Sequence, residues 1–139
     1  MPKIIDDFRG EYAFLSNFYE VTPYRTVEHY YQSEKTVNPD HRGWIITAGT
    51  AAESKRRGRE IVLRAGWDDM KLSVMRDLLI WKFGFKALAE KLLATGDAEL
   101  IEGNTWGDTY WGICRGVGSN HLGKLLMDIR GQLAEYQKG

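Results

Sequence analysis

Apolar residues recur at helical spacing through the second half of the chain. The spacing is followed over residues 68–83, and it continues over 85–94 until Gly96 ends it. A third stripe lies on an expected closing helix over 120–136; it consists of Leu122, Leu125, Leu126, Ile129 and Leu133. Each stripe has to be buried against another element, so the sequence predicts a mostly helical core.

The first half predicts shorter elements. Residues 3–20 are typical of one or two strands broken by turns. Thr26 is a candidate N-cap for a helix over 27–36, which the turn signals Asn38 and Pro39 end. Further helices are expected over 41–46 and over 50–64, the latter closed by Gly66 and strengthened by an i,i+4 pair, Glu60 and Arg64.

A glycine-rich segment separates the helices at 85–94 and 120–136. A short strand is expected at 100–102, and the glycines of NTWGDTYWGICRGVG then interrupt any long element. The sequence indicates a loop with short strands that could form a site. A chain of 139 residues is long enough to bury one core, so a single domain over residues 1–139 is predicted.

Charge and cysteine content narrow the classes of function. The 19 basic and 19 acidic residues cancel, which argues against a whole-molecule field that attracts nucleic acid or membranes. One cysteine and three histidines show no zinc-ligand spacing, and the longest strictly apolar run, residues 78–81, is too short to cross a bilayer. We therefore expect a soluble, cytoplasmic protein with no metal and no membrane partner.

The helix expected over 27–36 carries a polar face. Glu28, Tyr31, Gln32 and Lys35 stand at i, i+3, i+4 and i+7, so they share one face along roughly 10 Å of axis. A carboxylate in the first turn is favoured in its ionised form. The alternative is that Glu28 only offsets the helix dipole, that Lys35 is solvated and that the tyrosines pack.

A second candidate is the basic run SKRRGRE. Lys55, Arg56, Arg57 and Arg59 surround Gly58, whose missing side chain could let a phosphate approach the backbone. A solvated helix face is the alternative for these four charges.

Three further segments have both a structural and a functional interpretation. Asp108 in GDTYWG could make a local Asx turn or take part in catalysis. Trp67 could be an ordinary buried residue or a stacking platform for a base. The segment GVGSNHLG could present amides to an anion, although its spacing is not that of a dinucleotide fingerprint. Nothing fixes a histidine next to Cys114, so a cysteine nucleophile is not supported.

Seven motifs occur in an order that resembles the NADAR (NAD and ADP-ribose) family. They are YAFLSNFY at 12–19, TVEHYYQSEK at 26–35, GRE at 58–60, AGWD at 65–68, LIE at 100–102, DTYWG at 108–112 and SNHLGKLLMDIR at 119–130. The resemblance covers nearly the whole chain and implies an α+β, predominantly helical fold. The chain departs from the family pattern at Thr36 and in ICRGVG, which leaves substrate choice open.

The resemblance also implies a set of site residues. The family's catalytic glutamate falls on Glu28, its motif lysine on Lys35, its tryptophan on Trp67 and its DxxWG aspartate on Asp108. The predicted substrate contacts are Asn17, Phe18, Tyr31, Gly58, Arg59, Trp67, Trp111, Gly112 and Asn120. Lys35 would either attack the anomeric carbon or contact phosphate, and Lys55, Arg57 and Arg59 are candidate pyrophosphate contacts.

The implied activity is that of an N-glycosidase on a ribose attached through nitrogen, without a cofactor. Removal of ADP-ribose from guanine bases of nucleic acid is the first expectation, with ADP-ribosylated DNA or RNA as partner. The alternatives are cleavage of ribosylamine phosphate intermediates of riboflavin biosynthesis, and a module that binds ADP-ribose or NAD without hydrolysis. A domain with a relict site would do neither.

Overall fold

The computed structural model describes residues 3–138, and over that range the chain has six α-helices, one 3-10 helix and six short strands. The predicted predominantly helical α+β class is confirmed. The chain forms two compact units. One is Asn17–Leu78, and the other comprises the chain up to Ser16 together with the chain from Leu79 onward.

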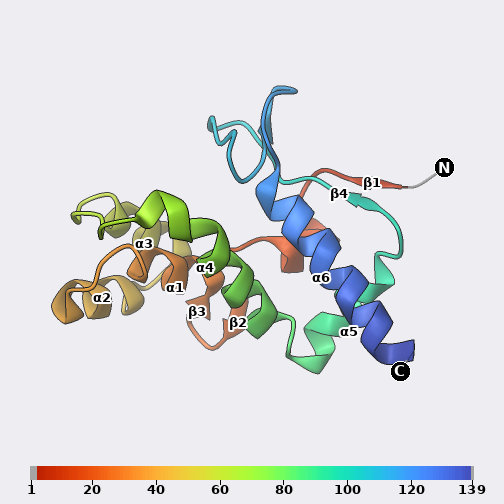
Figure 1. The fold of residues 1–139 in the computed structure, drawn as a ribbon, viewed down its shortest axis with the longest axis horizontal. Helices are drawn as coiled ribbons and strands as arrows, with labels where there is room; N and C mark the ends of the chain where they lie inside the picture. The colour runs from red at the N-terminus through yellow and green to blue at the C-terminus, as the bar shows by residue number, and fades with distance from the viewer. Residues whose placement is uncertain (1–2, 139) are drawn as a thin grey trace. The chain divides into compact units, whose positions relative to one another are not determined.

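The unit Asn17–Leu78 is built around the shortest α-helix, α1 (Figure 1). Its elements are β2 (Glu20–Thr22), β3 (Arg25–Thr26), α1 (Val27–Ser33), α2 (Pro39–Ile46), α3 (Ala51–Gly58) and the first part of α4 (Trp67–Lys82). Strands β2 and β3 pair antiparallel, and α1, α2 and α3 all contact one another. Val27, Ile45 and Ala48 are fully buried between them.

Side-chain caps fix where these three helices begin. Thr26, Asn38 and Thr50 each accept hydrogen bonds from backbone N–H groups of the following turn, at 2.9–3.2 Å. Such a cap satisfies N–H groups that have no partner inside the helix. The predicted cap at Thr26 is confirmed, whereas Asn38 begins a new helix as well as following the previous one.

Several element boundaries differ from the sequence prediction, including the following three in the first half of the chain. Residues Gly10–Leu15 form a 3-10 helix, η1, where strands were expected; Gly10 takes a left-handed φ of 60° at its start, and Phe14 and Leu15 are buried at its end. Helix α1 ends at Ser33 where residue 36 was predicted, and α3 ends at Gly58 where residue 64 was predicted.

The early end of α3 has a visible cause. The backbone N–H of Arg64 donates to the carbonyl of Lys35 at 2.7 Å, so the chain after α3 is tied to the end of α1 and cannot continue as a helix. The predicted Glu60–Arg64 pair is replaced by two others: Arg64 lies 3.7 Å from Glu34, and Glu60 lies 3.9 Å from Arg56.

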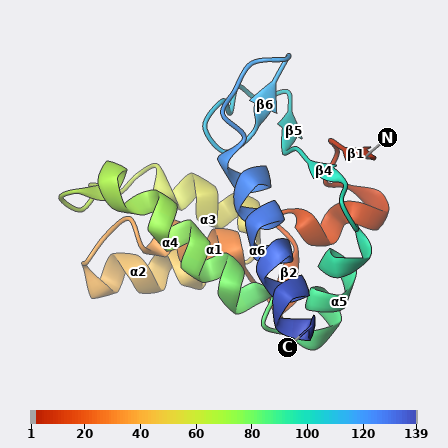
Figure 2. The same cartoon turned by 45° about the vertical axis from the view of Figure 1, so that its right-hand side comes forward.

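The second unit packs its helices on a long-range strand pair. β1 (Ile4–Ile5) pairs parallel with β4 (Glu99–Leu100), and β5 (Gly103–Asn104) pairs parallel with β6 (Ile113–Cys114). Helix α6 (His121–Lys138) contacts both β4 and α5 (Lys86–Ala94), as Figure 2 shows. The fully or almost fully buried side chains of this unit include Leu15, Leu79, Phe83, Leu92, Leu100 and Leu126.

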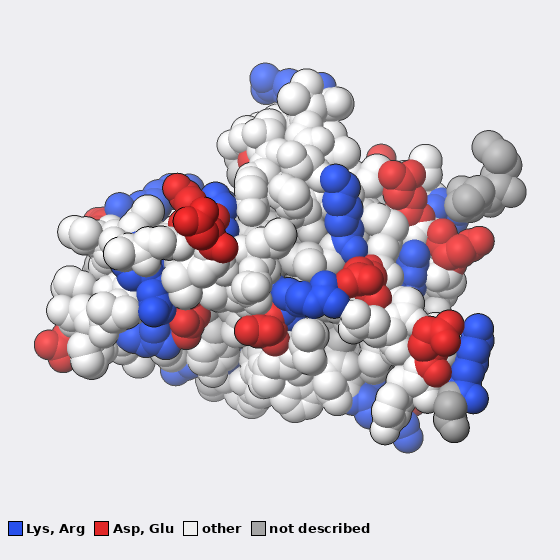
Figure 3. All heavy atoms as spheres, in the orientation of Figure 1, with Lys and Arg blue, Asp and Glu red and all other residues white. Residues whose placement is uncertain are grey.

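The surface carries both signs of charge. Figure 3 shows lysine and arginine interspersed with aspartate and glutamate over the visible face, without a broad area of one sign. Between residues 3 and 138 no helix has the length and hydropathy that a bilayer crossing requires. The same part of the chain holds no group of three or more His, Cys, Asp or Glu residues placed to bind a metal ion.

Candidate functional site

The twelve predicted site residues divide between the two units. Eight lie in Asn17–Leu78, and they are Asn17, Phe18, Glu28, Tyr31, Lys35, Gly58, Arg59 and Trp67. The other four lie in the unit that contains α6, and they are Asp108, Trp111, Gly112 and Asn120. The eight residues of the unit Asn17–Leu78 form a candidate site within that unit.

Glu28 is held in the first turn of α1 at both its backbone and its side chain. Its backbone N–H donates to the carbonyl of Asn17 at 3.1 Å, which ties the SNF motif to the start of the helix. Its carboxylate Oε1 accepts a hydrogen bond from Nε2 of Gln32 at 3.1 Å. Glu28 is 6% exposed, so its carboxylate is buried in the first turn of α1.

His29 follows Glu28, but both nitrogens of its ring are used in contacts that hold the fold together. Its Nδ1 lies 2.9 Å from the hydroxyl of Thr26, and its Nε2 lies 2.9 Å from the carbonyl of Ala48. Burial lowers the pKa of His29, which favours the neutral ring. A neutral ring that donates from Nε2 and accepts at Nδ1 satisfies both contacts, so His29 joins α1 to the segment before α3.

Lys35 lies just beyond the end of α1 and not on it. Its backbone N–H donates to the carbonyl of Gln32 at 3.2 Å, which tightens the last turn. Its ammonium lies over the ring of Tyr31, with Nζ 5.6 Å from the ring centroid. The side chain is half-buried, so the solvated lysine of the alternative interpretation is not what the structure contains.

Burial is the main reason why the pKa of Lys35 is lowered. The carboxylate of Glu28 opposes this effect, because a nearby negative charge favours the ammonium form. Three neighbouring cations, Arg59, Lys55 and Lys71, lower the pKa further. The site thus combines a buried carboxylate, a desolvated amine and a local excess of positive charge.

Trp67 supports the tyrosine beneath this lysine. It is the first residue of α4, its ring centroid lies 5.3 Å from that of Tyr31, and the two rings are tilted by 53°. Both side chains are 5% exposed. The ring of Trp67 is therefore buried against Tyr31, which is the ordinary packing role that the sequence had left open for it.

The basic residues of α3 and its C-cap divide by their contacts: Arg57 pairs with other residues, whereas Lys55 and Arg59 act on Lys35. The guanidinium of Arg57 lies 3.2 Å from the carboxylate of Glu53, donates to the carbonyl of Trp44 at 2.6 Å and stacks on the Trp44 ring. The guanidinium of Arg57 is therefore engaged by Glu53 and by Trp44 of α2. The cations that act on Lys35 are Arg59, Lys55 and Lys71, and no sequence motif had singled out Lys71. Lys71 also contacts Asp68 at 3.3 Å.

Asp108 organises the glycine-rich loop of the other unit. Its Oδ1 accepts hydrogen bonds from the backbone N–H groups of Tyr110 at 3.1 Å and Trp111 at 2.9 Å. The amide of Asn104 clamps the same residue, since it accepts from the Asp108 N–H and donates to the Asp108 carbonyl. This is the Asx turn that the sequence allowed. A catalytic role for Asp108 stays a prediction.

Gly112 and Asn120 hold the same loop to β4. A Cβ on Gly112 would collide with the backbone and carboxylate of Glu102. The Asn120 side chain accepts from the N–H of Glu102 at 3.0 Å and donates to the carbonyl of Leu100 at 2.9 Å. These contacts give both residues a structural task, and substrate contact by either stays a prediction.

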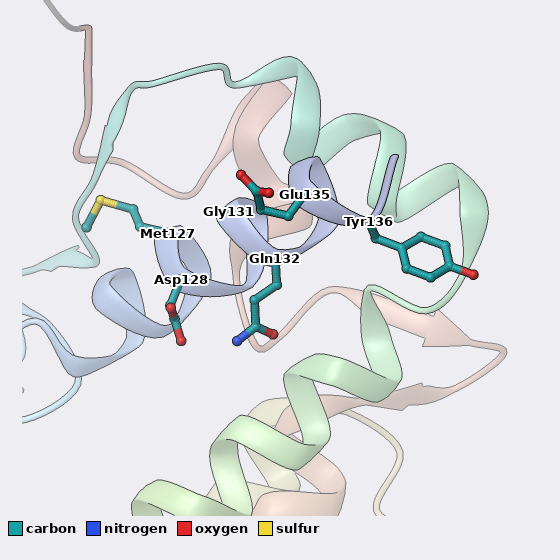
Figure 4. Close-up of a pocket in the computed structure, with 6 residues that line it drawn as sticks. All are labelled: Met127, Asp128, Gly131, Gln132, Glu135 and Tyr136. Carbon is teal, nitrogen blue, oxygen red and sulfur yellow. The ribbon is translucent and has the colours of Figure 1, made fainter. Parts of the chain in front are cut away.

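A groove on the C-terminal helix is separate from all predicted site residues. Figure 4 shows its six lining residues, which all belong to α6: Met127, Asp128, Gly131, Gln132, Glu135 and Tyr136. Its charged side chains, Asp128 and Glu135, are both acidic, and no lysine or arginine lines it. It does not offer the chemistry of the site on α1.

Comparison with known proteins shows the family to which this fold and this site belong. A family model described as the NADAR domain matches residues 6–134, and the chain belongs to this family. Among its relatives, the N-glycosidase Npun_R5314 of Nostoc punctiforme is 38% identical over 135 residues, covering 88% of this chain and 86% of that protein. The N-glycosidase YbiA of Escherichia coli (strain K12) is 42% identical over 113 residues, covering 78% and 70%.

Two further comparisons concern the fold and a longer relative. The NMR structure of Escherichia coli YbiA matches with a TM-score of 0.82 and 35% identity, covering 99% of this chain and 89% of that one. The riboflavin biosynthesis protein VVA0006 of Vibrio vulnificus is 37% identical over 135 residues, covering 90% of this chain but 36% of that protein. The predicted family and enzyme class, a hydrolase of N-glycosyl bonds, are confirmed.

Proposed function

We propose that the protein cleaves the bond between C1 of a phosphorylated ribose and the nitrogen of its base, with Glu28 and Lys35 as the reacting groups. The observation that supports this most is the pairing of a buried carboxylate with a desolvated amine on one helix and its following turn. Sites of enzymes are where such perturbed groups gather.

Glu28 is the proposed electrostatic partner of the reacting carbon. Breaking a ribosyl C–N bond builds positive charge on the sugar, and a fixed carboxylate beside C1 stabilises that charge. The hydrogen bonds to Asn17 and Gln32 hold Glu28 before substrate arrives. Such preorganisation lowers the barrier because no rearrangement is needed during the reaction.

Lys35 is the proposed nucleophile. Its neutral amine would form a bond to C1 as the bond to the base nitrogen breaks, and the proton lost by the amine would leave with the base. The ring oxygen of ribose would then separate from C1 to give an imine, and water would hydrolyse that imine to the free sugar and the amine. The lowered pKa supports this role, since only the unprotonated amine can attack.

The cations around Lys35 support a phosphorylated substrate. Arg59, Lys55 and Lys71 are close enough to influence the charge of Lys35, and the overall charge of the chain is zero. A local excess of positive charge without a global one fits a small anion, such as the phosphates of a ribose derivative. Arg57 is not part of this proposal, because its guanidinium is engaged by Glu53 and Trp44.

Asp108 and Trp111 stay in the proposal on the strength of the family motif alone. One oxygen of Asp108 is used by two backbone N–H groups, and we assign water orientation or proton transfer to the other oxygen. We assign contact with the base to Trp111.

We place removal of ADP-ribose from guanine bases of nucleic acid first among the substrates. A ribosylamine phosphate intermediate of riboflavin synthesis is the second candidate, favoured by relatives named as riboflavin biosynthesis proteins in Vibrio vulnificus and Zea mays. Both substrates present a phosphorylated ribose joined through nitrogen, so both suit the same carboxylate and amine. We also propose a cytoplasmic location, where either substrate would be met.

Parallel incubations separate these possibilities. The protein would be mixed with DNA carrying ADP-ribosylated guanine and, separately, with the ribosylamine phosphate, and the freed sugar would be measured in each case. Release from the DNA is the expected result, and release only from the ribosylamine phosphate would move the assignment to the second candidate. Saturable binding of ADP-ribose in calorimetry without release of sugar would instead indicate a binding module.

A further inference from the structure

The side-chain amide of Gln32 donates a hydrogen bond to the carboxylate of Glu28. Its Nε2 lies 3.1 Å from Oε1 of Glu28, one helical turn earlier, and Gln32 is 3% exposed. A hydrogen bond to a charged acceptor is about twice as strong as one between neutral groups. The contact also fixes which end of the amide faces Glu28, because the opposite orientation would set two oxygens against each other.

The other end of the Gln32 amide has an unusual environment. Its Oε1 is buried, and no hydrogen-bond donor of the described residues reaches it. An unsatisfied buried acceptor costs about 1–3 kcal/mol. Such a group in a native structure calls for a specific reason, and the hydrogen bond from Nε2 to Glu28 supplies one.

Gly58 explains how this amide fits. Glycine 58 is the last residue of α3, it is buried, and a Cβ there would collide with Oε1 and Cδ of Gln32. The missing side chain therefore serves the contact between α1 and α3. It does not leave open space for a phosphate at that Cα, which was the reason that the sequence suggested for this glycine.

We infer that Gln32 is the positioning residue for Glu28, and that α3 holds Gln32 in place through Gly58. The inference rests on the proposed function, since it assigns to Gln32 the task of aiming a carboxylate at the reacting carbon. Gln32 itself touches neither the sugar nor the base. Its effect on catalysis passes entirely through Glu28.

The first test removes the donor and keeps the shape. Gln32→Met has a similar length and no N–H group, so it removes the hydrogen bond from position 32 to Glu28 while α1 stays packed. We expect kcat to fall roughly 10- to 100-fold with KM changed less than about twofold, because the carboxylate acts on the transition state. Thermal unfolding of each variant reports on folding.

The second test displaces the Gln32 side chain by a substitution in α3. Gly58→Ala should lower kcat to a similar extent by displacing the amide, although alanine is the better helix former. In a Gln32→Ala background the same Gly58→Ala change should cost less than about twofold, since nothing is left to displace. Gly43→Ala in α2 is the matched control, because a Cβ there meets no other atom, and it should leave kcat unchanged.

The outcomes separate the inference from the function on which it rests. Loss of turnover in Glu28→Gln together with normal kcat in both Gln32→Met and Gly58→Ala would overturn the positioning role alone. Normal turnover in Glu28→Gln would overturn the proposed function itself. Equal costs of Gly58→Ala with and without Gln32 would show that the glycine acts on helix packing and not through the amide, which would also overturn the inference.

Discussion

A buried lysine away from the candidate site should make the stability of this protein depend on pH. Lys82, near the end of α4, is 0% exposed, and its Nζ donates to the carbonyl of Ser16 at 2.8 Å. Burial lowers the pKa of Lys82 from 10.5 to about 7. The variant Lys82→Met keeps the length of the side chain and removes the titrating amine.

The size of the effect follows from the two pKa values. In the unfolded chain the amine returns to its ordinary pKa of 10.5, so between about pH 7 and 10.5 the unfolded state binds more protons than the folded state. The free energy of unfolding therefore rises with pH in this window. The cost of burying the charged form is fully present below pH 7 and is lost above 10.5. Between pH 7 and 9 the gain amounts to about 2 kcal/mol, since the folded amine is already half titrated at pH 7.

Urea unfolding at pH 7, 8 and 9 measures this gain directly. Between pH 7 and 9 the wild type should gain about 2 kcal/mol relative to Lys82→Met, whatever the other titrating groups contribute to both. Lys86→Met, at an exposed position on α5, is the control and should follow the wild type. If the free energy of unfolding depended on pH in the same way in the wild type and in Lys82→Met, the reasoning that burial lowers the pKa of Lys82 would be refuted.

Three further perturbations test the elements around the site. Thr26→Ala removes the cap of α1 and should lower the free energy of unfolding by about 1 kcal/mol in urea titration, while Thr26→Ser should not; an unchanged midpoint in the alanine variant would contradict the capping role. Lys35→Arg should abolish turnover, and borohydride should trap a sugar adduct on the wild type by mass spectrometry, whereas full kcat with only a raised KM would reduce Lys35 to a phosphate contact. Because its pKa is lowered, the free amine of Lys35 should also make turnover rise with pH from a lower pH than an ordinary lysine would. Asp108→Asn keeps the acceptor for both loop N–H groups, so Tm should move by less than about 2 °C while kcat falls roughly 100-fold; unchanged kcat would leave Asp108 a structural residue only.

Local sequence signals were enough to predict several helices of the fold. Thr26 was recognisable as a cap because its hydroxyl serves the next turn, and the closing helix followed from the spacing of its leucines. The end of α3 was not predictable in the same way. It depends on a hydrogen bond between Arg64 and Lys35, which are distant in sequence and meet only when α1 and α3 pack.

The candidate site shows the same division between local and long-range information. The helical spacing of Glu28 and Gln32 predicted that they share a face, and the structure joins them by a hydrogen bond. Lys71 gave no sequence signal, because one lysine on a helix is ordinary until the fold brings it near Lys35. Gly58 did stand out in the sequence, but its neighbour is the Gln32 amide, which only the packing of two helices could reveal.

The proposed catalysis depends most on the negative charge at position 28. Glu28→Gln keeps the shape of the side chain and removes the negative charge that we place beside the reacting carbon. Glu20→Gln, at an exposed position on β2, is the matched control.

Release of sugar from DNA carrying ADP-ribosylated guanine is the most direct measurement. We expect the rate for Glu28→Gln to fall at least about 100-fold with an unchanged Tm, and the rate for Glu20→Gln to equal that of the wild type. A folded Glu28→Gln protein that releases the sugar at the wild-type rate would contradict the central claim.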